Sequence, residues 1–340
     1  MSKTVLKKIK NTFKFIIDPD YRFRILANRG IYNGMDDREY LERQFHFVFK
    51  EKLNLDNPRT FNEKLQWLKL YDRKPEYSIM VDKYRVREYV ADIIGEEYLI
   101  PLLGVWDDPD KIDFDNLPDQ FVLKCNHNSG LGMCICKDKS NLNITEVRKE
   151  LRKGLNQNYY LTKREWPYKN VPRKIIAEKY MSDNATMISD WKHMVIDEQE
   201  NGITQMANDL TDYKFYCFNG VVKAIGIYSD RNSDLSTKAD YFDRDFNWLN
   251  FEWGYPHAVN RPKKPLMFEE MIELAEKLSK DLVQVRVDLY LCGEQIYFGE
   301  LTFFDGSGLE RFCPDAIDDE WGKWIKLPDL KGETVRKLIS

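Results

Sequence analysis

The chain has 340 residues, with 52 Lys and Arg against 56 Asp and Glu, 43% apolar residues and 14% aromatic residues. This composition is that of a folded globular protein with enough apolar material for two or three packed units, and it excludes a wholly disordered chain or a small disulfide scaffold. The net charge of −4 also argues against general nucleic-acid binding, which needs a net basic surface.

The first thirty residues are basic, unlike the rest of the chain. Within 3–17, apolar side chains recur at helical spacing between lysines, which predicts a basic amphipathic helix. Such a helix either docks on its own domain or makes weak peripheral contact with an anionic membrane surface. The apolar run Phe15-Ile16-Ile17 is far shorter than the ~20 residues that span a bilayer, so we expect a cytoplasmic protein, with peripheral contact at the inner face of the membrane as the alternative.

The six cysteines form no CxxC pair. In a chain of this length they are typical of reduced thiols in a reducing compartment rather than of a disulfide framework. The set Cys125, His127, Cys134 and Cys136 does not have the spacing of a familiar structural zinc site.

Helices and strands alternate along the chain. Thr60 and Glu63 have capping-box spacing before an apolar run, and Asp82 is placed to cap a second helix that ends at Gly95. The predicted helices cover 61–71, 83–94, 146–155 and 268–282, and the predicted strands cover 98–103, 121–124, 133–136, 174–177, 213–218, 221–228, 284–291 and 295–304. Strand pairs separated by single helices predict an α+β protein with antiparallel sheets covered by helices.

The last predicted hairpin carries the most informative polar pattern. Because side chains alternate along a strand, Arg286 and Asp288 share one face, as do Glu300 and Thr302. With a turn near Gly293, Arg286 is expected opposite Glu300, and Asp288 one diagonal step away, within about 7–8 Å. Two carboxylates so placed suit Mg²⁺ bound together with substrate phosphates; an Arg286–Glu300 cross-strand ion pair is the structural alternative.

A loop rich in Gly, Asn and Ser, residues 126–132, follows Lys124 at the end of a strand. Small residues let backbone N–H groups approach an anion, and a lysine supplies positive charge for a phosphate. The loop does not match the P-loop pattern, so a plain hairpin loop remains open. Glu178 and Tyr180 end a later apolar strand before the polar stretch 182–210, which is a hinge-like position, and Lys214 adds charge to the next hairpin.

Taken together, the chain resembles the ATP-grasp ligases, and in particular the TupA-like branch named for a teichuronopeptide biosynthesis protein. The resemblance spans about residues 57–326. It is carried by FNEKLQWLKLY at 61–71, DK at 82–83, FVLKCNH at 121–127, REWPY at 164–168, IAEKY at 176–180, DYKF at 212–215, RVDLY at 286–290 and GELT at 299–302.

The resemblance implies that two α+β subdomains clasp ATP between antiparallel sheets. It implies catalytic roles for Arg286, next to the transferred phosphoryl group, and for Lys124. The residues implied in nucleotide binding are Lys83, Lys124, His127, Ser129, Gly130, Gly132, Glu178, Lys179, Tyr180, Met181, Asp212 and Lys214. Asp288, Glu300 and Thr302 are the implied Mg²⁺ ligands, although the family usually has Asn at the position of Thr302.

The resemblance also implies an organisation in segments. We expect a helical N-terminal extension at 1–60, an N-terminal subdomain at 61–119, a small lid subdomain at 120–181, a large subdomain with the metal site at 182–326, and a tail at 327–340. The excursion 182–210 is longer than the family leads us to expect between the hinge and Asp212, which is implied to bind the ribose.

The function implied is that of an ATP- and Mg²⁺-dependent ligase that joins a carboxylate to an amine through an acyl phosphate. A uronic acid and an amino acid of a capsular or surface polysaccharide are the substrates that the family suggests. One alternative is a polysaccharide glycosyltransferase, for which Asp18/Asp20, Asp108/Asp110, Asp113/Asp115 and Asp243/Asp245 offer Asp-x-Asp pairs. The other is a non-catalytic module that binds nucleotide or polysaccharide.

Overall fold

The computed structural model describes residues 12–181, 211–229 and 237–329. Residues 12–17 are helical, while the rest of the predicted basic helix and the whole excursion 182–210 lie outside the described residues. No helix in the described ranges is both long and apolar enough to cross a membrane.

The chain divides into two compact units. Unit 1 contains 1–78, 158–171 and 304–340, and unit 2 contains 79–157 and 172–303. The five-segment organisation expected from the family resemblance stays a prediction. Each unit is described below by itself.

Unit 1 is built mainly of helices. Its elements are α2 Pro19–Asn28, α3 Asp37–Phe49, α4 Phe61–Tyr71, α8 Tyr160–Lys163, η4 Trp166–Tyr168, η7 Asp305–Gly308, β12 Phe312–Cys313 and α10 Ala316–Trp324, and α5 Tyr77–Met80 follows at the boundary. Helix α4 has the predicted bounds, and both hydrogen bonds of the Thr60–Glu63 capping box are present. Phe61 of α4 packs edge-on against Trp321 of α10, with ring centroids 5.6 Å apart.

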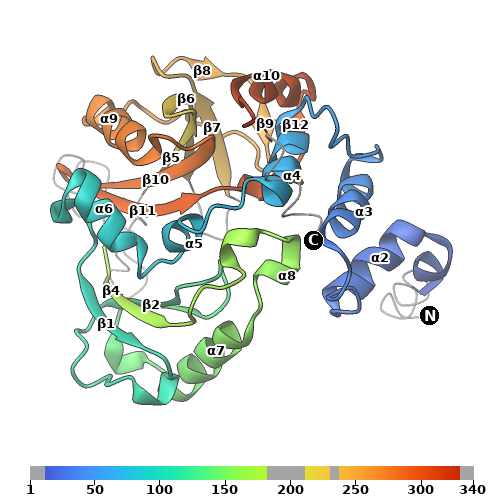
Figure 1. The fold of residues 1–340 in the computed structure, drawn as a ribbon. Coiled ribbons are helices and arrows are strands. Elements are labelled where there is room, and N and C mark those ends of the chain that lie inside the picture. The colour runs from blue at the N-terminus through green and yellow to red at the C-terminus, as the bar shows by residue number, and fades with distance from the viewer. Residues whose placement is uncertain (1–11, 182–210, 230–236, 330–340) are drawn as a thin grey trace, which may run out of the picture. The chain divides into compact units, whose positions relative to one another are not determined.

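Unit 2 begins with a four-stranded antiparallel sheet in the order β1-β4-β2-β3. Its strands are β1 Leu102–Trp106, β2 Phe121–Cys125, β3 Met133–Cys136 and β4 Ile175–Lys179. The short η2 Pro109–Lys111 and η3 Lys139–Asn141 lie in its connections, and α7 Ile144–Asn156 packs on one face (Figure 1). Phe121, Leu123 and Leu151 belong to the core between sheet and helix.

Two predicted elements before this sheet are wrong in their bounds. Tyr98, the first residue of the strand predicted over 98–103, instead ends η1 Glu96–Tyr98, and β1 starts only at Leu102. Pro101 has no N–H to donate to a ladder, so the strand begins after it. The predicted helix over 83–94 starts at Val86 as α6 Val86–Ile94, because Asp82 accepts the N–H groups of the turn before it rather than those of the helix.

The second sheet of unit 2 has six antiparallel strands in the order β11-β10-β5-β6-β7-β8. They are β5 Asp212–Phe218, β6 Val221–Ser229, β7 Lys238–Phe242, β8 Trp248–Leu249, β10 Gln284–Cys292 and β11 Gln295–Thr302, with β9 Glu252–Trp253 between β8 and β10 in sequence. The predicted Asn219-Gly220 turn joins β5 to β6, and both turn residues have positive φ, as a two-residue hairpin turn requires.

Helix α9 Phe268–Ser279 covers the apolar face of this sheet. Val285, Val287 and Leu289 of β10 are fully buried and alternate with polar residues. Because alternate side chains point to opposite faces, the polar residues of β5, β10 and β11 share the other face. That face carries the candidate site.

Candidate active site

The register of the last hairpin places two carboxylates side by side. Asp288 on β10 lies directly opposite Glu300 on β11, and Arg286 lies opposite Thr302. The expectation that Arg286 would lie opposite Glu300 is therefore wrong. The pairing passes from Leu289–Phe298 to Asp288–Glu300, so the strand that carries Glu300 has one extra residue.

That extra residue is Gly299, which forms a β-bulge. Without the bulge, the register on the turn side of the hairpin would continue, and Glu300 would pair with Val287. The Glu300 side chain would then point toward the apolar face, because a slip of one residue reverses the side-chain directions. A Cβ atom at Gly299 would lie 2.9 Å from Cε2 of Tyr290 and 3.1 Å from the carbonyl oxygen of Asp288. A residue without a side chain thus allows the close approach that puts both carboxylates on the polar face.

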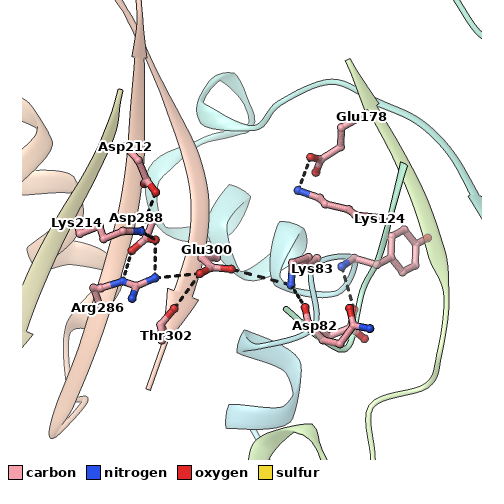
Figure 2. A network of polar contacts seen from close by, with 12 residues as sticks. Asp82, Lys83, Lys124, Glu178, Asp212, Lys214, Arg286, Asp288, Glu300 and Thr302 are labelled. Carbon is pink, nitrogen blue, oxygen red and sulfur yellow. Dashed lines mark hydrogen bonds and ion pairs between the residues drawn. The ribbon is translucent and has the colours of Figure 1, made fainter. Parts of the chain in front are cut away.

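Arg286 binds both carboxylates (Figure 2). Its Nε and Nη2 donate to the two oxygens of Asp288 at 2.6 and 2.7 Å, and Nη2 also donates to Oε1 of Glu300 at 3.0 Å. Thr302 Oγ1 donates to the same Glu300 oxygen at 3.1 Å. The predicted metal ligands therefore form one hydrogen-bonded group, in which Thr302 orients Glu300.

Both carboxylates are held in the ionised form. Burial acts to raise the pKa of Asp288, but Arg286 and Lys214 outweigh it, and the pKa lies below its ordinary value. The pKa of Glu300 is also lowered, because Lys83, Arg286 and Lys214 together outweigh its burial and the repulsion from Asp288. The site therefore presents ionised oxygen ligands, the kind that Mg²⁺ prefers.

Lys214 on β5 extends this cluster across a third strand. Its Nζ lies 2.6 Å from Asp288 and 2.7 Å from Asp212, and it is directly opposite Asp288 in the sheet. Burial and Arg286 act to lower its pKa, but the three carboxylates around it raise the pKa of Lys214 above its ordinary value. Asp212, Lys214 and Asp288 are almost completely buried.

A second group of charges belongs to the four-stranded sheet and α6. Lys124 of β2 lies 2.6 Å from Glu178 of β4, and Arg87 of α6 lies 3.5 Å from the other oxygen of that carboxylate. Lys83 lies 4.0 Å from Glu300 (Figure 2), which links the two groups within unit 2. Burial is the main reason that the pKa of Lys83 is lowered.

The predicted phosphate loop is anchored at its first residues. Lys83 Nζ donates to the carbonyl oxygen of Asn128 at 2.6 Å, and Asn126 donates to Asp82 at 2.8 Å. Ser129 and Gly130 are exposed. Gly132, by contrast, is a packing residue, since a Cβ atom there would lie 2.8 Å from the Cα of Gly154 in α7.

His127 lies within the same loop, where its ring faces the residue that ends α7. It is buried, and its Nε2 is 3.1 Å from the carbonyl oxygen of Gln157. Within the part of the chain that the structure describes, its Nδ1 has no hydrogen-bond partner, and burial lowers the pKa of the ring. The structure therefore gives His127 a packing position against the end of α7, and its role toward a nucleotide stays a prediction.

The predicted hinge continues β4. Glu178 is buried, Lys179 is exposed, and Tyr180 and Met181 are half-buried. The Tyr180 hydroxyl is buried and has no hydrogen-bond partner among residues 12–181, 211–229 and 237–329. The residues after Met181 lie outside the described ranges, so the adenine-binding role of this segment stays a prediction.

The acidic side chains of the site decide which metal it suits. Among the described residues there is no group of three or more His, Cys, Asp or Glu side chains that could hold a metal by itself. Mg²⁺ is usually bound by one or two carboxylates together with substrate phosphates. The ionised pair Asp288 and Glu300 matches that donor set, so the site suits an Mg²⁺ that arrives with a nucleotide.

The sequence did not indicate the roles of three residues near this site. Arg87 pairs with Glu178, Asp82 accepts a hydrogen bond from Asn126, and Asn126 anchors the start of the loop. Arg87 follows Lys83 by four residues, a spacing that indicates two cations near each other at the start of a helix. The partner of Arg87, Glu178, is far away in sequence, which is why the pair escaped notice.

The four Asp-x-Asp pairs considered for a glycosyltransferase serve local structure. In each pair, the first aspartate accepts a backbone N–H within the next three residues: Tyr21 for Asp18, Asp110 for Asp108, Asp115 for Asp113, and Asp245 for Asp243. Such aspartates cap helices and turns. Their spacing therefore has a structural explanation.

Comparison with known proteins gives one family match. The model of the family described as TupA-like ATPgrasp matches residues 63–205 and 187–326. No curated protein matches the chain.

Several solved structures are similar at low identity. D-alanine–D-alanine ligase from Bacillus anthracis complexed with ATP aligns at 15% identity and a TM-score of 0.36, over 66% of this chain and 54% of that one. D-alanine–D-alanine ligase from Helicobacter pylori aligns at 14% identity and a TM-score of 0.38, over 78% and 69%. An ADP complex of N5-carboxyaminoimidazole ribonucleotide synthetase aligns at 11% identity and a TM-score of 0.39, over 77% and 56%. The chain thus spans little more than half of the first of these structures.

Proposed function

The chain belongs to the TupA-like ATP-grasp family, and on that premise we propose that it is an ATP-dependent ligase that joins a carboxylate to an amine. ATP with Mg²⁺ is the cofactor pair of ATP-grasp ligases, and the α+β architecture with antiparallel sheets is the fold expected of them. The observation that carries the proposal is the cluster of Arg286, Asp288 and Glu300, with Lys83 4.0 Å from Glu300.

The charges of this cluster suit phosphoryl transfer. Lys83, Lys124 and Arg286 would neutralise the triphosphate, and Asp288 and Glu300 would hold Mg²⁺ beside it. Bound Mg²⁺ supplies charge neutralisation at the β- and γ-phosphates. Phosphoryl transfer depends mainly on positioning and electrostatic stabilisation, so no covalent protein intermediate is needed.

In the first step a substrate carboxylate oxygen attacks the γ-phosphorus of ATP. The P–O bond to ADP breaks, which gives an acyl phosphate and ADP. Arg286 would stabilise the transferred phosphoryl group. Its guanidinium already donates to Asp288 and to Glu300, the two carboxylates that would hold Mg²⁺ beside that group. In the second step an amine attacks the acyl carbon, the C–O bond to phosphate breaks, and an amide, inorganic phosphate and a proton are released.

The remaining nucleotide contacts are proposed from the family pattern and from the positions of the residues within unit 2. Glu178 to Met181 would read the adenine, and Asp212 would take the ribose. Asp212 already lies 2.7 Å from Lys214, so a ribose there would have to share the carboxylate with this lysine. Ser129 and Gly130, which are exposed in the loop, would close over the phosphates.

The substrates that we propose are a uronic acid and an amino acid or another amine, in the assembly of a surface polysaccharide or its precursor. The resemblance to the TupA-like branch supports this choice. We also propose a cytoplasmic location, with the predicted basic helix over residues 3–17 as a weak peripheral contact to the membrane.

The test is to incubate the protein with ATP, Mg²⁺ and mixed uronic acids and amino acids, and to measure ADP and phosphate. We expect fast release of both products only when a carboxylate and an amine are present together. Glu300→Gln should abolish this turnover, whereas Glu294→Gln, at the exposed turn of the same hairpin, should leave it unchanged. Absence of MgATP binding by the folded protein would contradict the proposal and favour a non-catalytic role.

A further inference from the structure

Glu178 of β4 is a buried carboxylate that lies between two cations from different elements of unit 2. Only 7% of the residue is exposed. Its Oε2 lies 2.6 Å from Nζ of Lys124, and its Oε1 lies 3.5 Å from Nη1 of Arg87. Among the described residues, these two are the cations within 4.0 Å of Glu178. The pair with Lys124 belongs to the proposed nucleotide site (Figure 2), whereas the proposed function gives Arg87 no task.

Lys124 reaches Glu178 from the neighbouring strand. It lies opposite Ile176 in the β2–β4 ladder, so it shares a face of the sheet with Glu178, which is two residues further along β4. The proposed function also needs Lys124 for the phosphates of ATP. A lysine that turns toward the phosphates leaves Glu178 less well compensated, and the phosphates add negative charge nearby. Both effects are costly for a buried carboxylate.

Lys83 does not replace Lys124 at Glu178. Its Nζ donates to the carbonyl oxygen of Asn128 at 2.6 Å and lies 4.0 Å from Oε2 of Glu300. Lys83 is therefore engaged with the loop and with a proposed metal carboxylate, and the proposed function uses it for the same triphosphate. Arg87 is the cation that remains for Glu178.

The helix that carries Arg87 is itself firmly attached. Arg87 lies in the first turn of α6, in which Val90 is completely buried. The hydroxyl of Tyr89 donates to the carbonyl oxygen of Leu278 at 2.9 Å, which ties α6 to α9. A guanidinium is weakly hydrated and always charged, which suits a desolvated ion pair, whereas a lysine carries a compact charge on a flexible stem. The two side chains therefore suit a fixed Arg87 and a Lys124 that changes partner.

We propose that Arg87 is a positioning residue for the nucleotide site: it keeps Glu178 paired while Lys124 turns from Glu178 to the phosphates of ATP. In this role Arg87 acts through Glu178 and makes no contact with the nucleotide. The inference rests on the proposed function, because it needs a nucleotide whose phosphates Lys124 binds. It adds a residue of α6 to the determinants of that site.

The test is a double-mutant cycle on the full chain, in which calorimetry measures the affinity for the nonhydrolysable analogue AMPPNP with Mg²⁺. Arg87→Met should weaken this affinity by about tenfold, the loss of one charge-assisted contact. In a Lys124→Met background the same substitution should change it by less than about twofold, because no lysine then leaves Glu178 when the phosphates arrive. Equal losses in the two backgrounds, or no loss in either, would overturn the inference.

Arg87→Lys and Arg152→Met are the matched controls. Arg87→Lys keeps a positive charge beside Glu178, so it should lose clearly less AMPPNP affinity than Arg87→Met. Arg152 on α7 also pairs with a carboxylate of another element, Asp110, at 2.7 Å, but at the surface. Arg152→Met should therefore leave the affinity within about twofold of the wild type. A loss in Arg87→Lys as large as that in Arg87→Met would show that the charge is not what matters and would contradict the inference.

Arg87→Gln provides a second variant in case Arg87→Met does not fold. Glutamine keeps a hydrogen-bond donor for Glu178 but carries no charge, so we expect a stable fold and the same loss of affinity that depends on Lys124. If the wild type binds AMPPNP and Arg87→Gln binds it equally well, the exchange of partners is wrong while the proposed function stands. If the folded wild type does not bind AMPPNP with Mg²⁺, both fail.

Discussion

Asp288 faces Glu300 across the β10–β11 ladder because Gly299 bulges out of the strand between them and the hairpin turn. Arg286 then bridges the two carboxylates. A backbone irregularity of one residue thus decides whether this hairpin has a site at all.

The bulge itself can be tested by Gly299→Val. The new side chain would collide with Tyr290, so we expect a loss of about 1–3 kcal/mol in the free energy of unfolding, as for other overpacked positions. Mg²⁺-dependent nucleotide affinity should fall with it, as measured by calorimetry. The control is Gly34→Ala, since nothing lies within 4 Å of a Cβ atom there; a Gly299→Val protein that behaves like the control would contradict the account.

Removal of the bridging guanidinium should make the protein depend on metal. In Arg286→Met, the buried Asp288 and the half-buried Glu300 face each other without the cation that bridges them, and losing one partner of a buried pair such as Arg286–Asp288 costs about 3–5 kcal/mol. Mg²⁺ should then raise the melting temperature of the variant more than that of the wild type. Arg244→Met removes a surface pair with Glu276 and should show no such difference. An equal response to Mg²⁺ in wild type and Arg286→Met would count against a metal at this pair.

Lys124 and Lys149 should differ in nucleotide binding although each of them pairs with a glutamate. Lys124 pairs with Glu178 within the site, whereas Lys149 is exposed and pairs with Glu146 on α7. We expect Lys124→Met to weaken ATP binding by about tenfold, the loss of one charge-assisted contact, and Lys149→Met to leave it within twofold. Fluorescent-nucleotide titration measures both, and the reverse order would place the phosphates elsewhere.

Burial of His127 predicts a pH dependence of stability. The pKa of His127 is lowered in the folded protein, so between that value and its ordinary value near 6.5 the unfolded chain binds more protons. Stability should therefore fall as pH decreases below about 6.5. Replacement by Gln should remove this part of the acid slope in urea titrations at several pH values, whereas His46→Gln, at an exposed position, should keep it. An unchanged slope in His127→Gln would show that His127 is not responsible.

The parts of the fold that local sequence determines were predictable. Helix α4 has the expected bounds because its capping box lies within four residues, and the Asn219-Gly220 hairpin turn follows from the two residues that form it. Helix α10 was missed. It has nine residues, too few to be stable alone, and it depends on the packing of Trp321 against Phe61, which is distant in sequence.

The same distinction applies to the site. The alternation of Arg286 with Asp288 and of Glu300 with Thr302 predicted which side chains share a face, and the structure brings all four together. The register could not be predicted, because the bulge at Gly299 is set by how β11 packs rather than by a turn signal. The contact of Arg87 with Glu178 joins residues far apart in the chain, so no spacing rule could find it.

The proposed mechanism requires that the γ-phosphate of ATP activates a substrate carboxylate. The most direct measurement supplies a uronic acid with ¹⁸O in its carboxylate, an amino acid, ATP and Mg²⁺, and analyses the released phosphate by mass spectrometry. Ligation through an acyl phosphate predicts that each phosphate released carries one ¹⁸O from the carboxylate. Phosphate that forms together with the amide but contains no ¹⁸O would contradict the account.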